Sequence, residues 1–256
     1  MNSTTPRFVW HELMTSDAAA ATSFYKAVIG WNAADAGMGQ PYTILSAGTT
    51  PIGGLMAIPD AAHRMGARPG WLGYIGVPDI EARAARIGAA GGKILRPIEP
   101  IPGVGRFAVM ADPQGAAFVL FQPDSAAAPA EAPEGTPGLI GWNELRAAEW
   151  DSGFAFYEQI FGWTRAEKMD MGPMGIYLIF ATGGKPVGGV ANKTPDMPMP
   201  HWGFYINVEG IDAAMQRVGT EGGRVLHGPH EVGGGSWIAE CVDPQGAQFA
   251  MVSSRR

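Results

Sequence analysis

The five residues Asp112-Pro113-Gln114-Gly115-Ala116 occur a second time in the chain as Asp243-Pro244-Gln245-Gly246-Ala247. Proline restricts φ and glycine tolerates positive φ, so each copy predicts a tight turn between two strands. An identical turn at two distant places indicates that the segments around it are related as well.

Further matches precede each copy of the turn, and they come in the same order. They pair Trp10 to Leu13 with Trp142 to Leu145, Phe24-Tyr25 with Phe156-Tyr157, Gly30-Trp31 with Gly162-Trp163, Pro51 to Gly54 with Pro186 to Gly189, and Gly91-Gly92 with Gly222-Gly223. The spacing changes by only a few residues, as loop insertions would cause. The chain is therefore a duplication, and its repeated glycine pairs account for part of its 37 glycines.

The duplication predicts two domains, residues 6–123 and 138–253, joined at 124–137 by a linker rich in alanine and proline. Each half reads as two βαβββ modules, so the predicted fold class is α+β with four modules in the chain. The modules can close within each half or pair across the halves, because a linker of this length permits either arrangement.

Local patterns predict the elements of the first module. Phe8–Thr15 is an apolar run typical of a strand, and Ala18–Ile29 predicts a helix with Ser16 or Asp17 as N-cap and Gly30 as C-cap. The matching second-half helix begins at Glu149 and ends at Gly162. The remaining first-half predictions are strands at Tyr42–Ala47, Ile52–Ile58, Trp71–Val77, Ile94–Arg96, Arg106–Ala111 and Ala117–Phe121, and a helix at Ile80–Ile87.

Composition excludes several classes of protein. Hydrophobic residues make up 46% of the chain and charged residues 16%, which is unlike a disordered segment. The net charge is -6 with no basic stripe, so no nucleic-acid partner is expected. Cys241 is the single cysteine, which excludes an intrachain disulfide and a thiolate zinc cluster.

The same sequence carries no membrane signal. No apolar run approaches the ~18 residues of a spanning helix, and the segment from Met1 to Arg7 lacks the pattern of a secretory leader. We expect a cytoplasmic location, with leaderless export left open. No membrane partner is expected, and a homodimer is left open.

The Phe-Tyr and Gly-Trp pairs, followed in order by the Asp-Pro-Gln-Gly turn, resemble the vicinal oxygen chelate superfamily. That superfamily contains glyoxalase I, bleomycin-resistance proteins, fosfomycin-resistance enzymes and extradiol dioxygenases. The resemblance covers nearly the whole chain, twice, and is most similar to two-domain glyoxalase-like proteins. It implies two glyoxalase-like, cupped mixed sheets, whereas function must be argued from the site.

The resemblance also implies three metal-ligand positions in each domain. They fall on Trp10, Leu72 and Val119 in the first half and on Trp142, Gly203 and Ala250 in the second. Metal ions in proteins are bound by His, Asp, Glu or Cys, and none of these six residues is of that kind. His11 lies one residue from the first position, but strand alternation turns it to the opposite face. No cofactor is therefore predicted, with one divalent metal ion per domain at an atypical site as the alternative.

Two carboxylates are candidate catalytic residues. Glu12 and Glu144 share a strand face with Trp10 and Trp142, because side chains two apart lie on the same face. An aromatic wall that removes water would suit either glutamate as an acid or a base. The competing interpretation is a structural carboxylate that both halves inherited from one ancestor.

Other residues are candidates for lining a ligand site, although core packing is an equal explanation for the tyrosines. Glu240 is a candidate in the second half alone, since the first half has Val109 there. The full ligand-binding set is Trp10, Tyr42, Leu72, Tyr74, Val119, Trp142, Tyr177, His201, Tyr205 and Glu240.

Three functions follow from these observations. The first is a glyoxalase/bleomycin-resistance-like protein that binds a small organic molecule, aromatic or not, in its cupped sheets without the family metal. The second is a glyoxalase-like lyase or a dioxygenase-type oxidoreductase, with an atypical metal site or with Glu12 and Glu144 as base. The third is a non-catalytic interaction protein.

Overall fold

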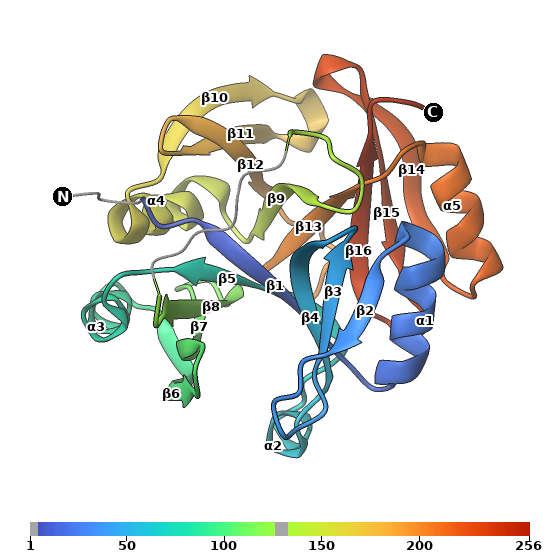
Figure 1. Cartoon of the computed structure of the whole chain (residues 1–256). Helices are drawn as coiled ribbons and strands as arrows, with labels where there is room; N and C mark the ends of the chain where they lie inside the picture. The colour runs from blue at the N-terminus through green and yellow to red at the C-terminus, as the bar shows by residue number, and fades with distance from the viewer. Residues whose placement is uncertain (1–4, 126–132) are drawn as a thin grey trace. The chain divides into compact units, whose positions relative to one another are not determined.

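The computed structural model describes residues 5–125 and 133–256 (Figure 1). The predicted linker at 124–137 lies partly outside them, since residues 126–132 are not described. The first half contains β1 (Phe8–Thr15), α1 (Ala18–Ile29), β2 (Asn32–Asp35), β3 (Thr43–Ala47), β4 (Thr50–Ala57), α2 (Asp60–Arg64), β5 (Gly70–Gly76), α3 (Ile80–Ala89), β6 (Lys93–Ile101), β7 (Gly105–Ala111) and β8 (Ala117–Pro123). The second half contains β9 (Ile140–Ala147), α4 (Trp150–Phe161), β10 (Thr164–Asp170), η1 (Gly172–Met174), β11 (Ile176–Thr182), β12 (Lys185–Asn192), β13 (His201–Asn207), α5 (Ile211–Thr220), β14 (Arg224–Val232), η2 (Gly233–Gly235), β15 (Ser236–Val242) and β16 (Gln248–Ser253).

The strands in the described part of the chain form two eight-stranded mixed sheets. Their orders are β2-β3-β4-β1-β5-β8-β7-β6 and β10-β11-β12-β9-β13-β16-β15-β14, so the second half repeats the first. Within each module the first and last strands are parallel, as in β1 with β4 and β13 with β16, and the rest are antiparallel. The predicted α+β class with four βαβββ modules is confirmed.

The predicted first helix is confirmed with its caps. Asp17, rather than Ser16, is the N-cap, because its carboxylate accepts the backbone N–H of Ala20 at 2.9 Å. Gly30 ends the helix at φ 86°, a conformation that favours glycine. In the second half Glu149 is the N-cap of α4 and not its first residue.

Two differences from the predicted elements have physical reasons. β6 continues to Ile101, beyond the predicted end at Arg96 and through Pro97 and Pro100. It is the last strand of its sheet, and an edge strand tolerates proline because its outer N–H groups need no partner. β2, at Asn32–Asp35, was not predicted, because four residues with a single half-buried side chain carry no alternating apolar pattern.

The described residues pack as two compact units that do not follow the halves. Unit 1 contains residues 5–9, 73–125 and 142–202, and unit 2 contains residues 10–72, 133–141 and 203–256. Each unit therefore combines one module of the first half with one module of the second. This answers the question that the sequence left open, because modules pack across the halves.

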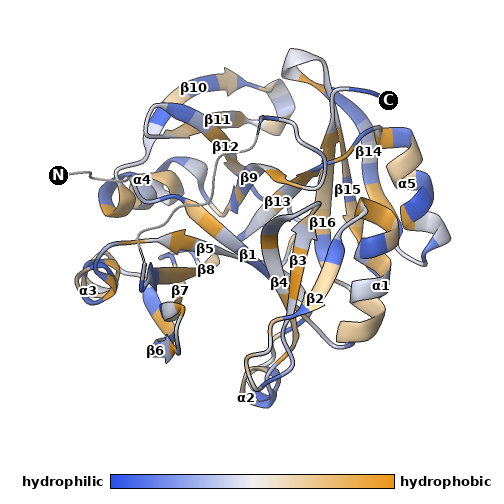
Figure 2. Cartoon of the chain, in the orientation of Figure 1, coloured by the Kyte–Doolittle hydropathy of each residue, from blue (hydrophilic) through white to orange (hydrophobic). Residues whose placement is uncertain are grey.

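Helices of the two halves meet within unit 2. α1 and α5 lie side by side (Figure 1), and Arg217 of α5 donates to the carbonyl of Val28 near the end of α1 at 2.9 Å. Hydrophilic and hydrophobic residues alternate along α5 (Figure 2), and its buried residues are Ile211, Ala214 and Val218. This spacing of three and four residues places one apolar stripe against the unit. In unit 1, Arg86 of α3 donates in the same way to the carbonyl of Gln159 in α4 at 2.6 Å.

Buried hydrogen bonds join the repeated motifs of opposite halves. In unit 2 the hydroxyl of Tyr25 donates to Asp243 at 3.2 Å, and the indole N–H of Trp71 donates to Tyr25 at 3.0 Å. In unit 1 the hydroxyl of Tyr157 donates to Asp112 at 3.0 Å, and Trp202 donates to Tyr157 at 2.9 Å. The tyrosine of each Phe-Tyr pair thus donates a hydrogen bond to the aspartate of the Asp-Pro-Gln-Gly turn in the other half.

None of the helices in the described residues has the length and apolar character that a membrane crossing needs.

We expect Tyr25→Phe and Tyr157→Phe each to lower the free energy of unfolding by about 1–3 kcal/mol, because a buried carboxylate and a buried indole N–H both lose a partner. Urea denaturation of the full chain measures this. Ser23→Ala, which removes an exposed hydroxyl from α1, is the control and should change stability by less than about 0.5 kcal/mol. Wild-type stability in both phenylalanine variants would contradict a structural role for these bonds.

The turn aspartates also predict a pH dependence of stability. Burial raises the pKa of Asp112 and Asp243, while hydrogen bonds from backbone N–H groups and a tyrosine partly offset it. A raised folded-state pKa gives a contribution that is present below the unfolded value, about 3.9, and is lost as the pH rises through the folded value. Asp112→Asn should therefore show a smaller loss of stability on going from acid to neutral pH. Urea denaturation at several pH values tests this, and identical pH profiles for the variant and the wild type would refute it.

Candidate functional site

The first module has two distinct faces, set by alternation along β1, β3 and β4. Leu13 lies beside Leu55 on the core face, where both are almost fully buried. Glu12 lies beside Gly54 on the other face, together with the half-buried Ile44. We call this second face the open face of the module.

A chain of two hydrogen bonds lies on this open face. The indole N–H of Trp10 donates to the hydroxyl oxygen of Tyr42 at 3.1 Å, and the hydroxyl of Tyr42 donates to Oε2 of Glu12 at 2.9 Å. Glu12 is 7% exposed, whereas Trp10 and Tyr42 are half-buried. We call Trp10, Tyr42 and Glu12 the first Trp–Tyr–Glu group; all three belong to unit 2.

The second half repeats the arrangement in unit 1. Trp142 donates to Tyr177 at 2.9 Å, and Tyr177 donates to Oε2 of Glu144 at 2.8 Å. Glu144 is 4% exposed, and its Oε1 forms an ion pair of 2.7 Å with Arg146. Trp142, Tyr177 and Glu144 form the second Trp–Tyr–Glu group. The first half has Met14 where the second has Arg146, so the two groups differ in this one neighbour on the strand.

Both tyrosines keep their protons. Burial raises the pKa of Tyr42 well above its ordinary value, and the negative charge of Glu12 raises it further. Burial and Glu144 act in the same way on the pKa of Tyr177. Each phenol is therefore a donor to its carboxylate at any physiological pH.

Two glycines make room for these tyrosines. A Cβ atom on Gly54 would overlap the hydroxyl of Tyr42, and a Cβ atom on Gly189 would overlap the hydroxyl of Tyr177. Both glycines neighbour the glutamates in register, as Gly54 with Glu12 and Gly189 with Glu144. The close approach of phenol to strand thus requires glycine at these two positions.

The metal-ligand positions implied by the family resemblance do not fit a metal ion. They carry Trp10, Leu72, Val119, Trp142, Gly203 and Ala250, and none of these side chains is a metal donor of the usual kind. No group of three or more His, Cys, Asp or Glu residues that could hold an ion occurs within residues 5–125 and 133–256.

The remaining candidate residues lie on other strands. In unit 1, Tyr74 of β5 pairs with Val119 of β8, and its ring centroid lies 6.1 Å from that of Phe121. In unit 2, Ala250 of β16 lies between Tyr205 of β13 and Glu240 of β15. His201 begins β13, and its Nδ1 lies 3.2 Å from the carbonyl oxygen of Met199. Leu72 and Gly203 are half-buried.

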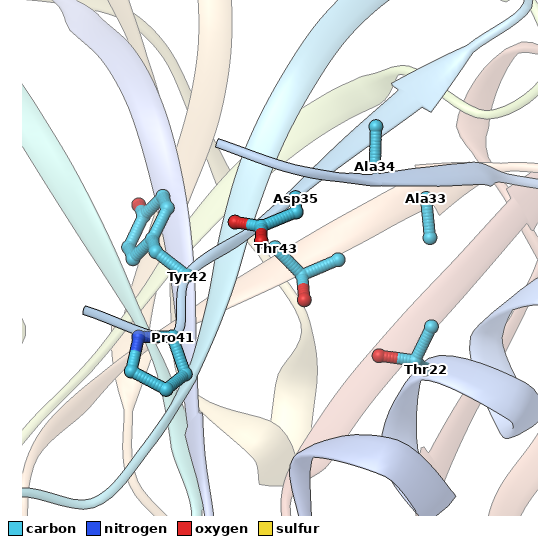
Figure 3. Close-up of a pocket in the computed structure, with 7 residues that line it drawn as sticks. All are labelled: Thr22, Ala33, Ala34, Asp35, Pro41, Tyr42 and Thr43. Carbon is cyan, nitrogen blue, oxygen red and sulfur yellow. The ribbon is translucent and has the colours of Figure 1, made fainter. Parts of the chain in front are cut away.

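A surface hollow borders the first Trp–Tyr–Glu group. It is lined by one residue of α1 and by residues of β2 and β3 with the turn between them: Thr22, Ala33, Ala34, Asp35, Pro41, Tyr42 and Thr43 (Figure 3). Tyr42 is the member that this hollow shares with the group. Asp35 is its single titratable side chain apart from Tyr42, so the hollow adds little chemistry of its own.

Three residues that shape the two groups were not among the predicted site residues: Arg146, Gly54 and Gly189. A signal for Arg146 was available, because it lies two residues after Glu144 and must share its face. The role of the glycines had no such signal, since the approach of a tyrosine to a strand depends on pairing of β3 with β4 and of β11 with β12.

The comparisons with known proteins agree with the fold. The family model described as "Glyoxalase/Bleomycin resistance protein/Dioxygenase superfamily" matches twice, at residues 7–120 and 139–251. The chain belongs to this superfamily, which confirms the resemblance drawn from the two repeated motifs.

Proteins with similar sequences match this chain over nearly its whole length and theirs. CFP32 of Mycobacterium tuberculosis, provisionally named a glyoxylase, is 31% identical over 248 residues, which is 95% of this chain and 93% of that protein. The anthracycline biosynthesis protein DauV of Streptomyces sp. strain C5 is 30% identical over 260 residues, 96% of this chain and 92% of that protein. The Mn(II)-bound glyoxalase of Novosphingobium aromaticivorans has a similar fold, with a TM-score of 0.64 at 17% identity, covering 99% of this chain and 83% of that one.

We expect Gly54→Ala and Gly189→Ala to displace the tyrosine and break its bonds to tryptophan and glutamate, since the added methyl group occupies the place of the phenol oxygen. Tryptophan fluorescence and near-ultraviolet circular dichroism should change in both variants. The controls are Gly88→Ala and Gly219→Ala, at exposed helical positions with open space for a methyl group. Spectra of Gly54→Ala and Gly189→Ala that match the controls would argue against this packing.

Proposed function

We propose that each Trp–Tyr–Glu group forms part of a binding site for a small organic molecule with an aromatic ring, and that binding needs no metal ion. One observation carries the proposal: the same three residue types, bonded in the same order, occur on the open face of both halves. Core packing alone does not require a carboxylate there, since burying one is costly unless it is hydrogen-bonded.

The chemistry of the open face supports an aromatic ligand. Half-buried indole and phenol rings provide flat apolar surface, and the carboxylate provides one polar anchor, which is the usual make-up of a small-molecule site. The name of one relative, the anthracycline biosynthesis protein DauV, supports a role with a small organic molecule.

A catalytic role is the second candidate function, and the geometry of the second Trp–Tyr–Glu group favours it. Glu144 is held on both oxygens, by Tyr177 on Oε2 and by Arg146 on Oε1. A carboxylate held in one orientation can accept a proton from a bound molecule, as a lyase or an oxidoreductase of the superfamily would need. A non-catalytic interaction protein with no small ligand remains the third candidate.

A direct test measures binding of a dihydroxynaphthalene, a dihydroxyanthraquinone and catechol to the full chain by calorimetry, with quenching of tryptophan fluorescence as a second readout. We expect at least one of them to bind. We also expect the double variant Glu12→Gln/Glu144→Gln to weaken binding about tenfold, the cost of replacing a charged hydrogen-bond acceptor by a neutral one. Glu231→Gln, at an exposed position, should bind as the wild type does. No binding by any of the three probes, or binding that is indifferent to both glutamates, would refute the proposal.

Elemental analysis separates the first candidate from a metal-dependent enzyme. Protein purified without a chelator should contain no stoichiometric transition metal, and dialysis against a chelator should leave probe binding unchanged. One bound metal ion per half, with binding lost on chelation, would favour the enzyme with an atypical metal site.

A further inference from the structure

We propose that the connection between β1 and α1 opens locally in unit 2, whereas the matching connection between β9 and α4 in unit 1 is held closed by a glutamine side chain. The β1–α1 connection is residues 16–17, and the β9–α4 connection is residues 148–149. Each connection directly follows the strand that carries the tryptophan and the glutamate of one Trp–Tyr–Glu group. The difference arises from the glutamines of the two Asp-Pro-Gln-Gly turns, Gln114 and Gln245, and it does not depend on a ligand.

In unit 1 the side-chain amide of Gln114 forms four hydrogen bonds with the start of α4. Its Oε1 accepts the backbone N–H groups of Ala148 at 2.7 Å and of Glu149 at 3.1 Å. Its Nε2 donates to the carbonyl oxygen of Glu149 at 2.9 Å and to the hydroxyl of Ser152 at 3.1 Å. Because the N–H groups at the start of a helix have no partner inside the helix, these bonds fix both residues of the β9–α4 connection.

In unit 2 the equivalent glutamine, Gln245, does not form the two bonds of Oε1. This oxygen is buried and has no hydrogen-bond partner among residues 5–125 and 133–256. The turn itself is not the cause, because each glutamine donates its backbone N–H to the aspartate of its own turn, at 2.9 Å for Gln114 and at 3.0 Å for Gln245. The difference therefore lies in what the side chain meets at the helix.

The space for the glutamine amide differs between the two helices. In α4 the amide of Gln114 lies against Gly153, where a Cβ atom would be 3.2 Å from Nε2 and 3.3 Å from Oε1. Both distances are shorter than the ~3.5–4.0 Å of an optimal non-bonded contact. When the helices are aligned by their Phe-Tyr pairs, α1 has Ala21 at this position. The methyl group of Ala21 therefore leaves less room for the side chain of Gln245.

Two further differences between the halves act in the same direction. Where Ser152 accepts a hydrogen bond from the glutamine, α1 has Ala20, whose methyl group accepts none. Where β9 ends in Ala147, β1 ends in Thr15, and the hydroxyl of Thr15 accepts the backbone N–H of Asp17 at 3.5 Å. In unit 1 the N–H at the matching position goes to the glutamine, so a long local bond replaces it in unit 2.

These differences make opening easier in unit 2. Opening the β9–α4 connection breaks the bonds of two backbone N–H groups to Gln114. Opening the β1–α1 connection breaks the 3.5 Å bond to Thr15 and lets water reach the unpartnered Oε1 of Gln245. Segments with few such bonds open at the smallest cost in free energy. The first Trp–Tyr–Glu group therefore follows a strand whose end is released more often than that of β9.

Hydrogen exchange of backbone amides in the full chain, followed by nuclear magnetic resonance, tests this. After correction for intrinsic rates, we expect Ser16 and Asp17 to exchange at least about tenfold faster than Ala148 and Glu149. A tenfold difference corresponds to about 1.4 kcal/mol, which one or two hydrogen bonds supply. Equal protection of the two connections would overturn the inference.

Replacement of the two glutamines should have unequal effects. Gln114→Ala should speed exchange at the β9–α4 connection at least about tenfold, whereas Gln245→Ala should change exchange at the β1–α1 connection by less than about twofold. Gly153→Ala should also speed exchange at the β9–α4 connection, although alanine normally stabilises a helix relative to glycine. Slower exchange in Gly153→Ala would contradict the inference, because helix propensity and not the space for the glutamine would then decide.

The reciprocal exchange of residues should create the missing bonds. The triple variant Thr15→Ala/Ala20→Ser/Ala21→Gly gives unit 2 the three residues of unit 1, and exchange at the β1–α1 connection should slow at least about tenfold. Gln245→Ala in this background is the matched control, because it keeps every change in helix propensity and removes only the amide. This control should restore fast exchange. A triple variant that exchanges like the wild type, or like its control, would overturn the inference.

Discussion

The buried bond from a tyrosine of one half to the turn aspartate of the other is the interaction on which the rest of the structure depends. Tyr25 reaches Asp243 in unit 2, and Tyr157 reaches Asp112 in unit 1. Neither half can form this bond alone, because the aspartate that accepts from each tyrosine belongs to the other half. The bond therefore needs both halves. In a single half the buried phenol would lose the acceptor of its proton, and Oδ2 of the buried aspartate would lose its tyrosine donor.

This core decides which side chains reach the open faces. β1 is held with Leu13 on the core face, so alternation turns Trp10 and Glu12 to the other face. A slip of one residue would bury the carboxylate in the core and expose the leucine. The same residue type then has two different roles. Tyrosines bonded to aspartate join the two modules within each unit, and tyrosines bonded to glutamate lie on the open faces.

Two kinds of feature could be predicted from the sequence: the duplication of the fold, and structure that depends on residues close together in the chain. The duplication, the helix from Ala18 to Ile29 with its caps and the facing of Glu12 with Trp10 all followed from spacing and alternation. It did not predict which tyrosine bonds to which carboxylate, because Tyr42 precedes β3, Glu12 lies on β1, and their bond depends on the pairing of both strands with β4. Packing across the halves was equally out of reach, since both arrangements use the same apolar patterns. The length of β6 was predicted too short, because its two prolines suggested that the strand ends at Arg96. An edge strand tolerates proline, so β6 continues to Ile101.

The position that the family resemblance gives to a metal ligand has a different task here. The indole N–H of Trp10 donates a hydrogen bond to Tyr42, and the hydroxyl of Tyr42 donates one to Glu12. Glu12 lies two residues from Trp10 on the same strand. The polar end of the group is therefore a buried carboxylate two residues from Trp10 on the same face of β1. The second half has the same order of bonds but adds Arg146 beside the carboxylate. The two groups of one chain therefore share the order of their bonds, and they differ in the side chain two residues beyond the carboxylate, which is Met14 in one half and Arg146 in the other.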